Sequence, residues 1–139
     1  MEKLQEQLIG AIVVGNLEEV KRLVEQGVDI HASDRALMLA AGQGHIGVVK
    51  YLVGQGADIH ADDANALKWA AEDGRLEVVK YLVEQGADIH AQDDYALRWA
   101  AQHGHLDIVK FLVEQGPIFL LRVRMEIFPV LSRVSREDI

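Results

Sequence analysis

The sequence contains no cysteine, and this absence excludes disulfide scaffolds, thiolate zinc sites and cysteine nucleophiles. Positive charge is scarce, because 14 Lys and Arg residues stand against 22 Asp and Glu residues and leave a formal net charge of -8. Nucleic acids and anionic membranes bind basic surfaces, so neither is expected as a partner. Long apolar runs are also absent, and none approaches the roughly 18 residues of a membrane span. The N-terminal apolar stretch lacks a small-residue cleavage site, so we expect no signal peptide and a cytoplasmic location.

Internal repetition is the main positive feature of the 139 residues, half of which are hydrophobic, as in a globular domain. A glycine-led segment recurs every 29 or 30 residues. Its copies read GNLEEVKRLVEQGVDIHA from Gly15, GHIGVVKYLVGQGADIHA from Gly44, GRLEVVKYLVEQGADIHA from Gly74 and GHLDIVKFLVEQG from Gly104. A second pattern precedes the last three copies and reads RALMLAAGQ, NALKWAAED and YALRWAAQH at 35–43, 65–73 and 95–103. Such repetition predicts stacked units, none of which can bury its apolar face alone.

Each unit is expected to form two helices. The apolar residues within 76–83 recur at helical spacing and share one face. The preceding helix is shorter and places Leu67 and two alanines on its inner face, where alanine lets two helices approach closely. Gly74 turns the chain between the helices, and Gly86 ends the second one, because glycine tolerates the left-handed backbone that closes a helix.

Three motifs carry a resemblance to a known family: the ALxxAA helix, the GHLxxVKxLVxxGAD helix and the Ala-Asp-Ile-His-Ala connector. Together they resemble the ankyrin repeat family over residues 15–116, and residues 1–14 fit the first helix of an N-terminal capping unit. The resemblance implies an all-α, ankyrin-type solenoid of stacked helix-turn-helix repeats with short connecting loops. The wording of the repeats is most similar to the ankyrin arrays of large DNA viruses, and a viral protein would act inside the host cell.

The repeats predict the division of the chain. The array covers residues 1–116, with a capping unit at 1–31 and repeats at about 32–61, 62–91 and 92–116. Residues 117–139 break the pattern and form an apolar segment with four Arg against three acidic residues, a net charge of +1. This segment could cover the last helix pair as a cap, mediate self-association, or be a disordered end. Its density of apolar residues favours a cap or a dimer contact.

The repeats depart from the family at the start of the first helix. Of the usual Thr-Pro-Leu-His, only the leucine is present. The loop between the connector and this leucine is shortened, so the projecting finger of the family is expected to be short. Asp63 and either Asp93 or Asp94 are expected to cap the first helices in place of the missing threonine.

The sequence offers little chemistry for catalysis or metal binding. Histidines that recur once per unit lie roughly 8–10 Å apart in stacked helices, too far to share a zinc ion that needs ligands at about 2 Å. Structural roles are therefore expected for all six histidines, which are His31, His45, His60, His90, His103 and His105. No Ser-His-Asp set in a nucleophile-elbow context, phosphate-binding glycine loop or HExxH motif is present. We predict no metal, no cofactor and no enzymatic activity.

Residues that change between units are candidates for partner contacts, because residues that repeat hold the fold. In the ankyrin family, the loops and first helices form the concave binding face. Carried over by position, the predicted partner-binding residues are Arg35, Asn65, Lys68, Tyr95 and Arg98, with Asp62 and Gln92 beside them. Their three cations and one tyrosine suggest a partner segment with acidic and aromatic side chains. The alternative is that they are ordinary solvated helix residues.

Trp69 and Trp99 occupy equivalent places in their units. We expect the two indoles to be buried and stacked across neighbouring units, which would stiffen the array. The alternative is an exposed aromatic ladder that contacts a ligand.

The function implied by the resemblance is that of a protein–protein interaction scaffold or adaptor without catalysis, whose partner is another protein. The alternative is a structural or engineered repeat protein that forms a homodimer through residues 117–139. The near-identity of the central units favours this alternative.

Overall fold

A computed structural model describes residues 2–30 and 35–115, except for the side chains of Glu2 and residues 62–64. These parts of the chain form eight α-helices and no strand. The helices are α1 (Glu2–Val14), α2 (Leu17–Glu25), α3 (Arg35–Gln43), α4 (Ile46–Gly54), α5 (Ala61–Glu72), α6 (Leu76–Glu84), α7 (Ala91–Gln102) and α8 (Leu106–Gln115). None of these eight is long and apolar enough to cross a membrane. The predicted all-α fold class is confirmed.

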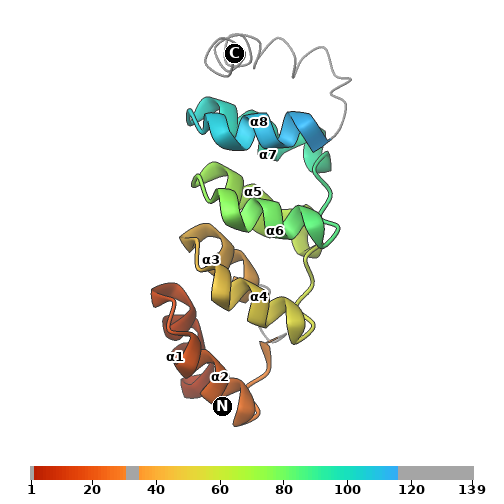
Figure 1. Cartoon of the computed structure of the whole chain (residues 1–139). Helices are drawn as coiled ribbons and strands as arrows, with labels where there is room; N and C mark the ends of the chain where they lie inside the picture. Colours follow the sequence, from red (N-terminus) through yellow and green to blue (C-terminus); the bar gives the residue numbers. More distant parts are fainter. Residues whose placement is uncertain (1, 31–34, 116–139) are drawn as a thin grey trace.

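The helices form pairs that follow one another along a stack from the N-terminal to the C-terminal end (Figure 1). Within each pair the two helices contact one another, as in α1 with α2 and α7 with α8. Helices α1, α3, α5 and α7 pack against one another in order and form what we call the first-helix layer. Helices α2, α4, α6 and α8 likewise form the second-helix layer. The two layers explain the repeated sequence, because each pair meets the next through equivalent surfaces.

The apolar residues that repeat between units are buried. In the pair α5 and α6, Leu67 is 1% exposed, and Val79 and Leu82 are fully buried. Their counterparts in the other described pairs are buried as well: Leu8, Val20, Leu23, Leu37, Val49, Leu52, Leu97, Val109 and Leu112. These side chains belong to one continuous core that runs through the stack. Burying each of them contributes about 1.5–3 kcal/mol to stability.

Glycines end the second helices and turn the chain between helices, as the sequence predicts. Gly74 links α5 to α6 at φ +77°, and Gly86 follows α6 at φ +98°. Both backbones are left-handed, a conformation that costs other residues about 1–2 kcal/mol. The predicted helix end at Gly116 lies outside the described residues.

A hydrogen bond from the residue after Gly44, Gly74 and Gly104 joins each of these units to the one before it. In each case a side-chain N–H donates to a carbonyl near the end of the preceding first helix. The bonds run from His45 Nε2 to Val13 at 2.9 Å, from Arg75 Nε to Gly42 at 3.0 Å and from His105 Nε2 to Glu72 at 2.9 Å. The structural role predicted for His45 and His105 is therefore confirmed, and Arg75 takes the same role in the middle of the stack.

Lysines and aromatic rings link the second helices in the same register at every junction. A lysine of one second helix lies over the ring of an aromatic residue in the next. The pairs are Lys21 with Tyr51 at 5.9 Å, Lys50 with Tyr81 at 5.7 Å and Lys80 with Phe111 at 6.0 Å, measured from Nζ to the ring centroid. We call these three pairs the lysine–aromatic ladder.

The first turn of α7 contains a stretch that the sequence does not predict, because Gln92, Asp93 and Asp94 have left-handed backbones. The right-handed part of α7 follows Asp94, where the sequence places the first helix, and α3 likewise begins at Arg35 as expected. Helix α7 begins at Ala91, after the N-cap residue His90, whose side chain makes no capping hydrogen bond. Asp94 is 5% exposed and forms a hydrogen bond with the His90 ring. The Asp94 side chain thus contacts the connector histidine, and the expected capping by Asp93 or Asp94 stays a prediction. The capping expected from Asp63 falls on a side chain outside the described ones, and the expectations for residues 117–139 fall outside as well.

Candidate partner-binding surface

The seven residues predicted to bind a partner are unequally accessible. Arg35 and Gln92 are exposed, while Asn65, Tyr95 and Arg98 are half-buried. Lys68 is 8% exposed. The side chain of Asp62 is not among those that the structure describes. The described members of this set all lie on the first-helix layer or at its loop end, so the fold brings them to one side of the stack.

Lys68 points into the junction between α5 and α7. Its Nζ lies 5.2 Å from the centroid of the Tyr95 ring, and the Arg98 guanidinium lies 6.0 Å from the same centroid. A cation over an aromatic face is attracted by the negative charge of the π-system, and more strongly where water is excluded. The Lys68 ammonium is therefore held by Tyr95 and is not presented as a free positive charge.

The environment of Tyr95 favours its neutral phenol. Partial burial raises the pKa of Tyr95, the carboxylate of Glu72 raises it further, and Arg98 acts in the opposite direction. Glu72 lies on α5 and Tyr95 on α7, so a negative charge acts across this junction. The junction between α5 and α7 thus contains the carboxylate of Glu72 as well as the ring of Tyr95.

Arg98 supports the loop end of α7. Its guanidinium donates to the carbonyl of Asp93 at 3.0 Å and to the carbonyl of Gln92 at 3.3 Å. Gln92, Asp93 and Asp94 have left-handed backbones, with φ of 53°, 57° and 59°. Three consecutive non-glycine residues in this region store strain, which surrounding contacts must offset. Arg98 supplies such contacts, so its positive charge has a role within the chain.

Aromatic rings run along α7 at helical spacing. The Tyr95 and Trp99 rings lie 5.4 Å apart between centroids, and Trp99 and His103 lie 5.4 Å apart. The His103 ring is also nearly parallel to the His105 ring, at 6.1 Å and 9°. Trp99 therefore packs against neighbours along its own helix, where the sequence suggested stacking across units.

Trp69 is 40% exposed, so the prediction that it is buried is wrong. The cause lies in the facing helix, where Gly42 has no side chain to cover the indole. A Cβ atom added to Gly42 would lie 3.0 Å from Trp69 Cε3, so one part of the ring rests on the α3 backbone. The sequence does carry a signal, because Gly42 is replaced by Glu72 and Gln102 in the equivalent places. The sequence alone does not show that Gly42 faces Trp69, so this difference between units can be interpreted only once the structure is known.

The histidines outside the unit junctions bind local partners. The backbone N–H groups of His60 and His90 donate to Asp58 Oδ1 and Asp88 Oδ1 at 2.8 and 2.9 Å. The His103 ring donates from Nδ1 to the Trp99 carbonyl at 2.8 Å. Among residues 2–30 and 35–115, no group of three His, Asp or Glu side chains could hold a metal ion.

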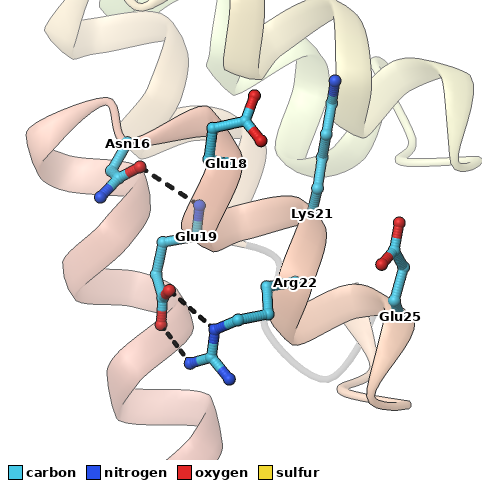
Figure 2. Close-up of a pocket in the computed structure, with 6 residues that line it drawn as sticks. All are labelled: Asn16, Glu18, Glu19, Lys21, Arg22 and Glu25. Carbon is cyan, nitrogen blue, oxygen red and sulfur yellow. Dashed lines mark hydrogen bonds and ion pairs between the residues drawn. The ribbon is translucent and has the colours of Figure 1, made fainter.

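A hollow of about 430 Å³ lies against α2, in the second-helix layer (Figure 2). It is lined by Asn16, Glu18, Glu19, Lys21, Arg22 and Glu25. Asn16 caps the helix by accepting a hydrogen bond from the Glu19 N–H at 3.2 Å. Arg22 donates from Nε to Glu19 at 2.8 Å, and this hydrogen bond lowers the pKa of the Glu19 carboxyl. Asn16 thus caps α2, and Glu19 and Arg22 form an ion pair along it. Exposed ion pairs of this kind contribute little to stability.

Comparison with known proteins identifies the repeat type. A family model of three ankyrin repeats matches residues 8–93 and again residues 62–122. Two ankyrin repeat proteins of Rickettsia felis are each 43% identical to the chain over 49 residues, or 32% of this chain. The aligned stretch covers 78% of one relative and 74% of the other. Both relatives are bacterial, and the likeness of the repeats to viral arrays stays a prediction.

Proposed function

Because the chain belongs to the ankyrin repeat family, we propose that it is a recognition module that binds another protein on its first-helix layer. Ankyrin repeats generally mediate protein–protein interaction, and the family is typically non-catalytic. The proposed contact residues are those that the sequence singles out: Arg35, Asn65, Asp62, Lys68, Gln92, Tyr95 and Arg98.

The observation that carries the proposal is the contrast between repeated and variable residues. The leucine of each first helix is the same in three units and is buried, at 5%, 1% and 3% exposure for Leu37, Leu67 and Leu97. Two residues before each leucine, the chain places Arg35, Asn65 and Tyr95, which are exposed or half-buried. Variation that falls on accessible positions leaves the stack intact and changes what the surface offers to a partner.

Affinity capture with the full chain tests the proposed surface. The baits are the wild type, a variant with Arg35→Ala and Tyr95→Ala on the first-helix layer, and a control with Lys50→Ala and Glu84→Ala on the second-helix layer. We expect a protein from a native lysate to be retained by the wild type and by the control and lost by the first-helix variant. Circular dichroism checks that all three baits are folded. A protein lost equally from both variants would remove the first-helix layer as the binding surface.

Self-association is the second candidate, and the apolar composition of residues 117–139 favours it. Light scattering of the full chain over a range of concentrations measures the mass directly. A stable dimer would support self-association as the function of this chain, whereas a monomer at all concentrations would contradict it.

A further inference from the structure

We propose that a basic side chain of the bound partner docks on Trp69, beside the carboxylates of Glu72 and Asp73. We call these three residues of the α5 end the Trp69 site. The inference rests on the proposed function and specifies its chemistry, because it makes the recognised segment basic, whereas the sequence suggested an acidic one.

The geometry at Gly42 brings an indole and a carboxylate to the same place. A Cβ atom added to Gly42 would lie 3.0 Å from Trp69 Cε3 and 3.3 Å from Asp73 Oδ2. Both side chains therefore converge over the α3 backbone, and both are exposed. An exposed indole beside a carboxylate suits a cation, which the π-face and the negative charge attract together.

The next junction repeats this arrangement with the carboxylate on the facing helix. Glu72 occupies in α5 the place that Gly42 occupies in α3, and Trp99 occupies in α7 the place of Trp69. The Glu72 carboxylate raises the pKa of Tyr95, so its negative charge acts on a residue of α7. Glu72 also follows Trp69 by three residues on α5, so the two side chains are neighbours along the same helix.

Three cations near this site, Lys68, Arg75 and Arg98, make contacts within the chain, while Arg35 lies on α3 and is exposed. Lys68 is 8% exposed and lies against Tyr95. Arg98 donates to the carbonyls of Gln92 and Asp93 in the first turn of α7, and Arg75 donates to the Gly42 carbonyl at 3.0 Å. The carboxylate of Asp73, by contrast, is exposed, and the whole chain has a formal net charge of -8. Charge complementarity therefore favours a basic partner segment over an acidic one.

Selection from a random-peptide display library tests the inference with a defined probe. The full chain is immobilised, bound peptides are sequenced, and one enriched peptide is labelled for titration by fluorescence anisotropy. The variants are Trp69→Ala, Trp69→Phe and the pair Glu72→Gln with Asp73→Asn. Glu84→Gln, an exposed carboxylate on α6 of the same unit, is the matched control. Circular dichroism verifies the fold of each variant.

We expect the enriched peptides to contain Arg or Lys next to apolar residues. Trp69→Ala should weaken binding by about tenfold and Trp69→Phe by less, because indole is the strongest of the aromatic cation acceptors. The carboxylate variant should weaken binding by about fivefold, and added salt should reduce this difference. Glu84→Gln should bind as the wild type does.

Two groups of results would overturn the inference. If the enriched peptides are acidic and Trp69→Ala fails to retain them, the first-helix layer remains the binding surface, but the proposal of a basic partner segment is wrong. Peptides retained equally by Trp69→Ala and the wild type, or no enrichment at all, would remove the Trp69 site. The proposed function would then be judged by the capture experiment with Arg35 and Tyr95, so the two failures are distinguishable.

Discussion

The two layers of the stack differ in how regular their junctions are. In the second-helix layer, every junction of the described residues carries the same pair of groups, a lysine over an aromatic ring at 5.7 to 6.0 Å. In the first-helix layer the junctions differ, because Asn65 donates to the Met38 sulfur in one and Lys68 lies on Tyr95 in the next. The same backbone register therefore supports uniform contacts on one side and variable contacts on the other.

This difference separates two requirements on a repeat protein. Stacking needs an interface that is the same at each step, and the second-helix layer and the buried core provide it. Recognition needs a surface that differs from unit to unit, and the first-helix layer provides it. Substitutions in the core and in the lysine–aromatic ladder should therefore mainly change stability, and substitutions of the accessible, variable residues of the first-helix layer should mainly change binding.

The largest expected effect is the loss of stability from the core. Leu82 is fully buried, and Leu82→Ala removes side-chain contacts and leaves a cavity, at a cost of about 2–5 kcal/mol. Trp69→Ala, at a residue 40% exposed, should cost clearly less. Urea unfolding followed by circular dichroism gives both free energies. If Trp69→Ala destabilised the chain as much as Leu82→Ala, the Trp69 side chain would have to be counted with the core.

The next effect compares two glycines of one unit. Gly74→Ala and Gly86→Ala both place alanine in a left-handed backbone, at about 1–2 kcal/mol each. The Cβ atom at position 74 would also lie 2.7 Å from His105 Cε1, whereas none of the surrounding atoms lies within 4 Å at position 86. Gly74→Ala should therefore cost about 1 kcal/mol more, since the His105 bond to Glu72 is disturbed. Equal losses of unfolding free energy in urea would show that His105 adapts freely.

A smaller effect distinguishes the lysine–aromatic pairs of the two layers. Double-mutant cycles with Lys→Met and Tyr→Leu measure the coupling in Lys68–Tyr95 and in Lys50–Tyr81. We expect about 0.5–1 kcal/mol for the exposed Lys50 and up to about 2 kcal/mol for the buried Lys68, because desolvation strengthens a cation–π contact. A larger coupling in the second-helix pair would contradict the view that Tyr95 sequesters Lys68.

The smallest expected effect is a shift in the titration of Tyr95. Its pKa is raised by burial and by Glu72, so the folded state holds the phenolic proton more tightly than the unfolded state does. The corresponding stability is present below pH 10 and is lost as the pH rises through the folded pKa. Absorbance of phenolate, taken as the difference between the wild type and Tyr95→Phe, reports this residue alone. Glu72→Gln should lower the pKa of Tyr95, and an unchanged value would show that burial acts alone.

Much of the fold could be predicted from the sequence, since the signals are local. The face of α6 that buries Val79 and Leu82 follows from helical spacing, and the turn at Gly74 follows from its place between two helical patterns. The start of α7 was less predictable, because the left-handed backbones of Gln92, Asp93 and Asp94 precede its apolar pattern. The boundaries of the units and the role of residues 117–139 stay predictions.

The candidate surface was predictable as a place and less so in its chemistry. The variable residues do lie on one side of the stack, at the first helices and their loop ends. Their accessibility could not be derived from single units, as Lys68 and Trp69 show. These neighbours in sequence were expected to be exposed and buried, respectively, and the structure has them the other way round.

The sequence by itself determined the period, the helix pairs, the turn glycines and the identity of the core, because each depends on spacing within one unit. Only the tertiary structure decided what the first-helix layer presents. Tyr95 of the next helix covers Lys68, and the missing side chain of Gly42 in the previous helix uncovers Trp69. The physical reason is that exposure on this layer is set by the residue across each junction, which belongs to another unit.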